Sequence, residues 1–348
     1  MRLNHRFKNC IILLIGIVYI MLTINGCDVK QTSMGYQHRL FIIVDSTLWK
    51  SIKTPVDEQF HSIIHTPHVE NSFYTTPIPL EDLNEFRSRM NLMFIGLANR
   101  DDPVSKYMRD VLPTEVTNDV ESGRYFYVFQ DDLFARDQIG IFLYAKDKQD
   151  FLTRFNTYKD DIYSKFEKKY FARLKKTMFE HGYEKEIYDF LKKNYGWTIK
   201  VQHDYFIAIQ DLQDNYVWLR RIQPDRWISI WELNDFTAKV NRDTLIQIRN
   251  RMGQKYYEGD QVVEEDTHFE HSMLSGRESK KLVGVWKNDS LMVGGPFRCY
   301  AFKSEQKQAL YVIDIAVMAP GQNKKPYLDQ LEVIADTFDP NPAQPGRD

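Results

Sequence analysis

Two groups of histidines have spacings that would suit a metal ion. His61 and His65 are four residues apart on a predicted helix with His68 close behind, and His268 and His271 are three residues apart beside an acidic run. Imidazoles on one helix face, alone or mixed with carboxylates, are ligands that Zn²⁺ accepts. Neither group supplies three ligands from ordered elements. The sequence therefore favours solvated or half-buried histidines, and we expect no metal and no cofactor.

The acidic run Glu264, Glu265 and Asp266 suggests a different chemistry. Two carboxylates in one cleft can act as general acid and as base or nucleophile in glycoside hydrolysis. The sequence has no GxG, GxxxxGK[ST], GxSxG, HExxH or CxxC pattern, and its one SxxK, Ser304 to Lys307, falls in a predicted turn. A binding or structural role without catalysis is therefore the leading interpretation. A hydrolase acting on glycans or cell-wall material is the alternative.

Three tryptophans suggest a binding surface. Trp227 and Trp231 are four residues apart in a predicted strand and share one face, and Trp218 alternates with Tyr216 and Arg220 on a neighbouring strand. If this row is exposed, it would stack on sugar rings, as in a glycan-binding module. If it is buried, it forms the core between a sheet and its helices, which is the interpretation that the sequence favours.

The N-terminal segment predicts export and lipid attachment. Three cationic residues precede fifteen almost wholly apolar ones, Cys10–Ile24, as in a secretory signal peptide. A helix of this length spans roughly 22 Å, less than the ~30 Å hydrocarbon core of a bilayer. The tetrapeptide INGC, which ends at Cys27, resembles the bacterial lipobox. This resemblance implies that residues 1–26 are removed and that Cys27 carries the lipid.

Lipidation would hold the chain on a membrane, because two or more acyl chains give stable anchoring. We expect the outer membrane of a cell envelope, facing the periplasm or the cell surface, with a glycan or an envelope protein as candidate partner. Loss of residues 1–26 removes three positive charges and changes the formal net charge from −2 to −5, which disfavours nucleic-acid binding. Cys299 would be the one thiol left unmodified, and its apolar strand predicts a buried structural thiol.

The hydrophobic pattern predicts an α+β fold, with antiparallel sheets, packed helices and two lobes joined by a long helical segment. We expect a tether over residues 27–37, an N-terminal lobe with a long helix pair over residues 38–196, and a C-terminal lobe over residues 197–338. The Pro-rich tail, residues 339–348, is expected to be disordered. The long helix, from Asp147 to Met178, carries an aromatic and apolar stripe at helical spacing. Such a stripe is typical of core.

The stretch GVWKNDSLMVGGPF, residues 284–297, predicts a hairpin at Asn288-Asp289 and a sharp corner between strands at Gly294-Gly295. Together with YVWLRR, RNRMGQKYYEGD and VMAPGQNKKPYLDQLEVIADTF, it resembles a family of Bacteroidota envelope lipoproteins of unknown function. The resemblance runs from about residue 38 to residue 338. It implies an envelope location and no assigned activity, so no catalytic residue follows from it. The segment HTPHVENSF departs from the family pattern at its histidines.

Overall fold

The structure is a computed structural model that describes residues 30–61, 63–64 and 70–342. The predicted signal peptide, Cys27, His65 and His68, and residues 343–348 of the predicted tail, lie outside the described residues. Within the described part, no helix has the length and apolar character needed to cross a membrane. The chain forms two compact units. One contains the chain up to Trp49 together with Thr76–Lys148, and the other contains Lys50–Thr75 and the chain from Gln149 onward.

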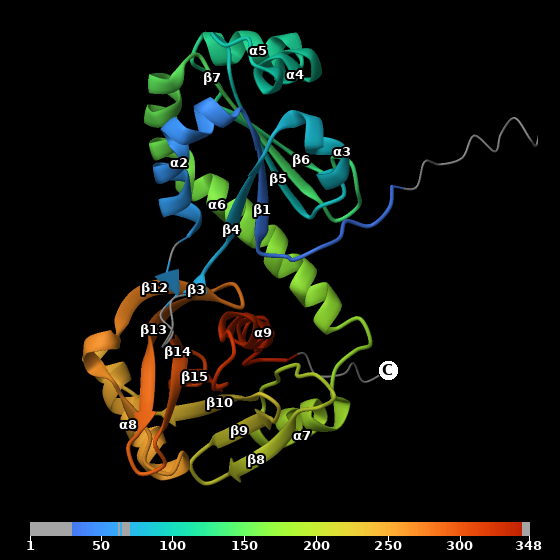
Figure 1. The fold of residues 1–348 in the computed structure, drawn as a ribbon. Coiled ribbons are helices and arrows are strands. Elements are labelled where there is room, and N and C mark those ends of the chain that lie inside the picture. Colours follow the sequence, from blue (N-terminus) through green and yellow to red (C-terminus); the bar gives the residue numbers. More distant parts are fainter. Residues whose placement is uncertain (1–29, 62, 65–69, 343–348) are drawn as a thin grey trace, which may run out of the picture. The chain divides into compact units, whose positions relative to one another are not determined.

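The first unit is built on a five-stranded sheet in the order β4-β1-β5-β7-β6 (Figure 1). Strands β1, β5 and β7 are parallel to one another, and β6 is antiparallel to β7. Every residue of β5 and β7 is buried, as is typical of parallel strands that are covered on both faces. The strands are β1 (Arg39–Val44), β4 (Tyr74–Ile78), β5 (Asn91–Leu97), β6 (Tyr127–Asp131) and β7 (Ile139–Ala145). The helices are α2 (Ser46–Phe60), which continues into the second unit, α3 (Leu83–Phe86), α4 (Pro103–Val111) and α5 (Thr114–Glu121).

The predicted α+β class is confirmed, and the first unit adds two features that the sequence pattern did not predict. Its three central strands are parallel, and their continuous apolar runs are those of strands buried on both faces. Helices α4 and α5 are short and mostly polar, so they lack a long apolar stripe. Helix α4 begins instead with a local signal, since the side chain of Asp102 accepts a hydrogen bond from the backbone N–H of Ser105.

The second unit contains an antiparallel sheet in the order β11-β13-β14-β15-β10-β9-β8, and β12 also pairs with β13. The strands are β8 (Phe206–Asp211), β9 (Tyr216–Arg221), β10 (Asp225–Asn234), β11 (Gln261–Val262), β12 (His268–Leu274), β13 (Arg277–Asn288), β14 (Val293–Ser304) and β15 (Ala309–Met318). The helices are α6 (Lys148–Met178), α7 (Lys185–Tyr195), α8 (Arg242–Tyr256) and α9 (Lys325–Ala335). The short strands β2 (Ile63–Ile64) and β3 (Glu70–Asn71) form a separate pair.

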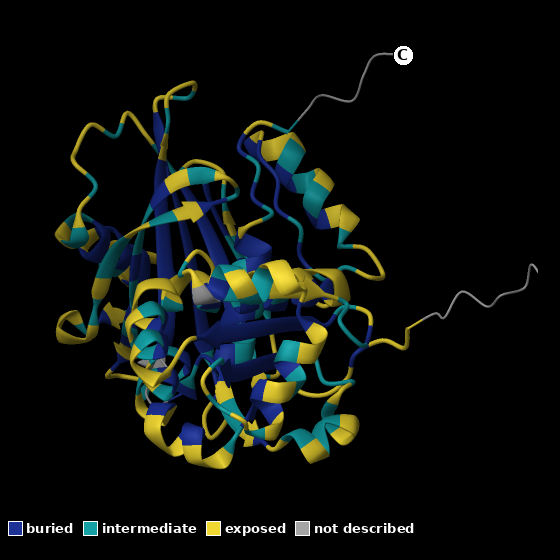
Figure 2. Cartoon of the chain, turned by 90° about the horizontal axis from the view of Figure 1, so that it is seen from above, coloured by how far each residue is buried: buried dark blue, intermediate teal, exposed yellow. Residues whose placement is uncertain are grey.

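Alternation along the strands gives this sheet two different faces. One face carries Trp227, Trp231 and Cys299, which pack with residues of α8 into a hydrophobic core. The opposite face carries Arg298 and Tyr300, whose side chains bond to residues of α9. In Figure 2 the strands are largely buried, whereas the helices alternate buried and exposed residues along their length. The charged groups of the α9 face are therefore held beneath a helix rather than in open solvent.

The predicted stripe on the long helix is core, with one exception. Phe151, Phe155, Ile162, Phe166, Tyr170, Leu174 and Met178 are buried, whereas Tyr158 is 40% exposed. The structure groups α6 and α7 with the C-terminal strands, although the sequence pattern assigned them to the N-terminal lobe. The reason is tertiary: Phe166 packs edge-on against Phe60 and Phe73, and the Tyr170 hydroxyl donates to Asp329 of α9 at 2.7 Å.

The stretch of residues 284–297 forms a hairpin as predicted, but its turn covers residues 289–292 instead of Asn288-Asp289, and the predicted corner is absent. Strand β13 ends at Asn288, which pairs with Val293 at the start of β14. The predicted corner at Gly294-Gly295 is wrong, because both glycines lie inside β14 and pair with β13. A Cβ atom on Gly295 would lie 1.9 Å from the carbonyl oxygen of Val317. Glycine is thus required there by the close approach of a neighbouring backbone, not by an unusual turn.

Candidate functional site

Those residues of the proposed metal and acid–base groups that the structure describes do not form one site. The His61 ring lies within hydrogen-bonding distance of the Thr75 hydroxyl, and His271 lies beside Lys280. Glu264, Glu265 and Asp266 form an exposed 3₁₀ turn and line neither of the two cavities described below. Within the described residues, no group of three or more His, Cys, Asp or Glu side chains could hold a metal ion.

The three candidate tryptophans belong to the core and do not form an exposed platform. Trp227 and Trp231 are 4% and 0% exposed, and the half-buried Trp218 packs against the same core. The indole N–H of Trp231 donates to the backbone carbonyl of Asp214 at 2.9 Å. Rings of Trp218 and Trp227 meet edge to face, with centroids 6.0 Å apart. The burial of this row corrects the glycan-stacking hypothesis in favour of the core interpretation.

A cavity of about 420 Å³ lies on the α9 side of the second unit. Helix α6 contributes Glu167, Phe171 and Lys175 to its lining, strands β13 and β14 contribute Lys281 and Tyr300, and α9 contributes Glu332. The rest of the lining is mainly small or apolar: Ala172, Ser272, Met273, Leu274 and Val333, with Asp336 just after α9. The cavity thus combines an apolar wall with charged groups of both signs.

Glu332 is the most tightly held charged group of the cavity. One carboxylate oxygen lies 2.5 Å from a guanidinium nitrogen of Arg298. The other oxygen lies 3.3 Å from Lys281 Nζ and accepts a hydrogen bond from the Tyr300 hydroxyl. Burial alone would raise the pKa of Glu332, but the charges of Arg298 and Lys281 and the Tyr300 hydroxyl together lower it to about 2. Glu332 is therefore an ionised, fully engaged carboxylate.

A second set of polar contacts fixes α9 beside the cavity. Asp329, one turn before Glu332, forms an ion pair with Lys325 and accepts the Tyr170 hydroxyl hydrogen bond. The carboxylate of the buried Glu70 accepts hydrogen bonds from the backbone N–H groups of Lys324 and Lys325, at 2.8 and 2.9 Å. These N–H groups stand at the start of α9, where a carboxylate also opposes the positive end of the helix dipole. Contacts at the start of α9 and at Asp329 therefore fix the helix segment that carries Glu332.

Glu167 differs from the other charged groups of the cavity. It is half-buried, and its one hydrogen bond within the described residues comes from the Tyr163 hydroxyl at a long 3.4 Å. Burial and, next, the charge of Glu332 raise the pKa of Glu167, although Lys325 and Lys281 act in the opposite direction. In the part of the chain that the structure describes, Glu167 thus has no direct cationic partner of the kind that Glu332 has. A ligand with a positive or hydrogen-bond-donating group would supply what this carboxyl lacks.

None of the charged residues of this cavity was predicted as a site residue from the sequence, although two local signals are present. Arg298 interrupts the apolar run PFRCYAF of β14, and a charge in a buried strand implies a buried partner. Glu167 is four residues after Tyr163 and three before Tyr170, so it borders the apolar stripe of α6. Neither signal identifies the partner, because Lys281, Arg298 and Glu332 come from three different elements.

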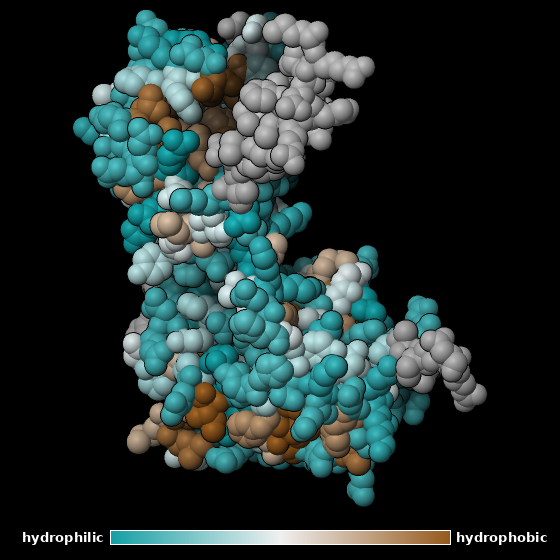
Figure 3. All heavy atoms as spheres, turned by 90° about the vertical axis from the view of Figure 1, so that its right-hand side faces the viewer, coloured by the Kyte–Doolittle hydropathy of each residue, from teal (hydrophilic) through white to brown (hydrophobic). Residues whose placement is uncertain are grey.

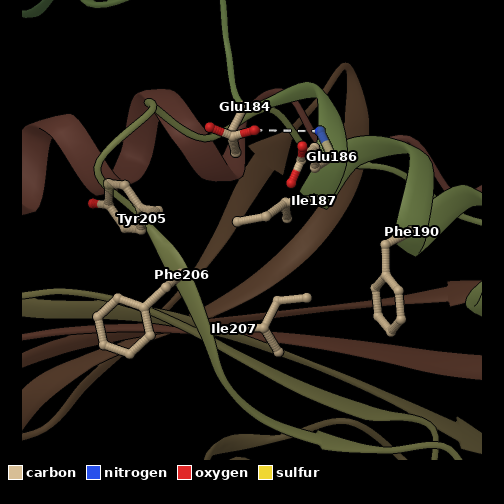
Figure 4. Close-up of a pocket in the computed structure, with 7 residues that line it drawn as sticks. All are labelled: Glu184, Glu186, Ile187, Phe190, Tyr205, Phe206 and Ile207. Carbon is tan, nitrogen blue, oxygen red and sulfur yellow. Dashed lines mark hydrogen bonds between the residues drawn. The ribbon is translucent and has the colours of Figure 1, made fainter.

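A second cavity, of about 600 Å³, lies between α7 and the edge strand β8. Figure 4 shows Ile187 and Phe190 of α7 and Ile207 of β8 around one space, with Glu184 and Glu186 at the start of the helix. The carboxylate of Glu184 accepts a hydrogen bond from the backbone N–H of Glu186 at 3.3 Å. Five of the seven residues that line this cavity are aliphatic or aromatic, the other two are glutamates, and none is basic.

Comparison with known proteins finds families without an assigned function. Residues 184–337 match a family described as "Domain of unknown function (DUF4837)", and residues 33–179 match one described as "Domain of unknown function (DUF8532)". The two matches meet between α6 and α7 and support the predicted resemblance to an uncharacterised family. No curated protein matches the chain in sequence.

Among solved structures, two similar chains cover less than half of this one. LpqN of Mycobacterium tuberculosis, described as involved in cell envelope biogenesis, is 14% identical with a TM-score of 0.26, over 41% of this chain and 81% of LpqN. The Saccharomyces cerevisiae Ran-binding protein Mog1p is 11% identical with a TM-score of 0.29, over 42% of this chain and 90% of Mog1p. Similarity at this level carries no statement about function.

Proposed function

We propose that the protein is a lipid-anchored binding protein of the cell envelope, attached through Cys27, and that it binds its ligand in the cavity beside Glu167. The observation that carries the binding role is the half-buried carboxyl of Glu167, which has no ion-pair partner among the described residues, in a cavity where the neighbouring Glu332 is held by Arg298 and Lys281. The lipid anchor rests on the cationic and apolar N-terminal segment and on the tetrapeptide that ends at Cys27. A bacterial envelope lipoprotein, as in the Bacteroidota family, fits both features.

Binding explains the cavity better than hydrolysis does. A glycosidase of the common two-carboxylate type needs an acid and a second carboxylate that is free to act as nucleophile or base. The raised pKa of Glu167 suits a general acid. However, both oxygens of Glu332 are engaged by Arg298, Lys281 and Tyr300, so Glu332 has no free oxygen for attack. We therefore place hydrolysis second.

The anchor is tested by cell fractionation. Wild-type protein and the variant Cys27→Ser are expressed with their signal peptides, and membrane and aqueous fractions are compared by immunoblot. We expect wild type in the membrane fraction and Cys27→Ser in the aqueous fraction, and mass spectrometry of the mature N-terminus should show an acylated Cys27. An unprocessed N-terminus, or a Cys27→Ser protein that stays with the membrane, would contradict lipidation.

The cavity is tested on the mature chain carrying Cys27→Ser, with and without Glu167→Gln. Calorimetry with L-lysine, glycine, N-acetylglucosamine and chitotriose samples amine, amino-acid and sugar ligands. We expect binding of at least one probe, weakened by Glu167→Gln and unaffected by Glu305→Gln, which changes an exposed glutamate in a turn. Release of reducing ends from cell-wall material that depends on Glu167 would instead favour the hydrolase.

A further inference from the structure

Strand β8 forms an open edge of the sheet in the second unit. It comes last in the strand order, and β9 is the only strand that pairs with it within the described residues. Its sequence, FIAIQD, contains neither lysine nor proline, which are residues that commonly protect an edge strand. Its one irregularity is a register shift between Ile207 and Ile209. The outer backbone groups of β8 are therefore placed to pair with another extended chain.

Apolar side chains flank this edge on both faces. Ile207 points into the cavity that it shares with Ile187 and Phe190 of α7 (Figure 4). Phe206 projects from the other side of the strand and is 43% exposed. Figure 3 faces the side on which α7 lies in Figure 1, and hydrophobic residues gather in patches on its lower part. A strand added beside β8 would thus find backbone partners and an apolar pocket for alternate side chains.

The charged residues of the cavity between α7 and β8 indicate which charge its occupant carries. Its two charged lining residues, Glu184 and Glu186, are both acidic. Glu184 is partly engaged, since His203 Nδ1 lies 3.2 Å from its carboxylate. Glu186 is exposed and lies in the first turn of α7. An occupant with lysine or arginine next to its apolar residues would complement these carboxylates.

A second copy of this chain fits the edge poorly. Two β8 strands paired antiparallel about a two-fold axis would bring Phe206 of one copy opposite Asp211 of the other. Asp211 and Asp214 share a single cation, Lys255, at 3.3 and 2.9 Å, so this end of β8 keeps a net negative charge. It would then lie beside Glu184 and Glu186 of the other copy, and like charges across an interface oppose association.

We propose that β8 accepts, as an added strand, an extended segment of a partner protein that carries both apolar residues and lysine or arginine on the face turned toward α7. The added strand pairs with the outer edge of β8, one apolar side chain enters the cavity between α7 and β8, and a basic side chain meets Glu186. This surface is separate from the cavity beside Glu167: the two share no lining residue. The proposal therefore does not depend on the ligand of that cavity.

The test uses fluorescein-labelled octapeptides and the mature chain carrying Cys27→Ser. The lysine peptide repeats Val-Val-Lys-Lys, so that valine and lysine alternate along each face of the strand. The glutamate peptide repeats Val-Val-Glu-Glu, and a third peptide is the lysine peptide with alternate backbone nitrogens methylated. Fluorescence anisotropy should show binding of the lysine peptide alone, because methylation removes the hydrogen bonds of strand pairing. Glu186→Lys should weaken binding about fivefold, as expected for an exposed charge pair. Glu278→Lys, the same change on β13 far along the strand order, should leave binding within about twofold.

Four results would overturn the proposal. Equal binding of the glutamate peptide would remove the charge argument, and equal binding of the methylated peptide would remove strand pairing. Failure of the lysine peptide to bind at millimolar concentration would remove the docking surface. If the unliganded protein sediments as a dimer, and Ile207→Asp converts it to a monomer, then a second copy of the chain occupies the edge instead. Circular dichroism and the melting temperature of each variant establish that it is folded.

Discussion

The variant Glu332→Gln tests how the cavity is held in place. Glu332 has a folded-state pKa of about 2, against an ordinary value of 4.5. A depressed carboxyl pKa stabilises the fold at pH values above the unfolded pKa, and this contribution is lost as the pH falls from about 4.5 toward 2. At 1.36 kcal/mol for each pKa unit, the carboxylate contributes about 3 kcal/mol at pH 7. Mutational data on buried ion pairs, about 3–5 kcal/mol for removing one partner, give a similar value.

Urea unfolding followed by tryptophan fluorescence suits this test, because five of the six tryptophans lie in the second unit. Glu332→Gln should lower the free energy of unfolding by about 3 kcal/mol at pH 7 and by about 1.5 kcal/mol at pH 3, where the wild-type carboxylate loses part of its advantage. Glu305→Gln, at an exposed site, should lie within about 0.5 kcal/mol of wild type. If Glu332→Gln lowers the free energy of unfolding by less than about 1 kcal/mol at pH 7, or by an amount that does not change with pH, then Arg298, Lys281 and Tyr300 do not stabilise the ionised carboxylate as inferred.

Three further predictions concern single side chains of the second unit. Glu167→Gln should raise the melting temperature at pH 7, because a carboxyl whose pKa is raised in the folded protein destabilises the fold at pH values above its ordinary pKa. The gain should vanish below pH 4, where the carboxyl is protonated in both states. An unchanged melting temperature at pH 7 would contradict this prediction. Gly295→Ala should lower the free energy of unfolding by about 3 kcal/mol, because the added methyl clashes with Val317. Gly321→Ala should lower it by only ~1 kcal/mol, because open space surrounds the added methyl and only the positive φ is unfavourable. The urea midpoints of the two variants test this difference. Cys299 is buried, and burial together with the nearby Asp314 raises its pKa, so in the Cys27→Ser mature chain it should react with a thiol reagent only as the protein unfolds. Rapid labelling in native buffer would show that the thiol is accessible.

Much of the local structure could be predicted because it depends on short-range patterns. The stripe on α6, the strands of the second unit and the hairpin after Asn288 follow from periods of 3.6 and 2 and from turn residues. Gly253 shows the limit of this reasoning. A glycine late in a helical pattern indicates a helix end, yet α8 continues to Tyr256. The glycine instead makes room for the carbonyl oxygen of Asp260, which lies 1.9 Å from where a Cβ would be. A conformational and a steric need for glycine have the same sequence signature.

The candidate site was less predictable because its parts are distant in sequence. The exposed acidic run and the histidines are recognisable in the sequence because they are clustered. The charged groups that line the cavity instead stand singly inside apolar segments. An isolated Arg298 in a buried strand requires a partner, but periodicity cannot show that the partner is Glu332, 34 residues later on a helix. The tryptophans illustrate the converse: their shared face was predicted correctly, while the helix that covers it follows from tertiary packing.

The second unit is discontinuous in sequence, and this affects how it can be made and divided. Lys50–Thr75 belongs to it, yet the carboxylate of Glu70 pairs with backbone groups 254 and 255 residues later. At synthesis rates of roughly 5–20 residues per second, that early segment waits about 10–50 s before α9 exists. A fragment cut at the boundary between the two family matches, near residue 184, would carry α9 without Glu70 and the cavity without Glu167. Expressing residues 30–183 and 184–342 together should restore the fold that neither fragment can complete alone.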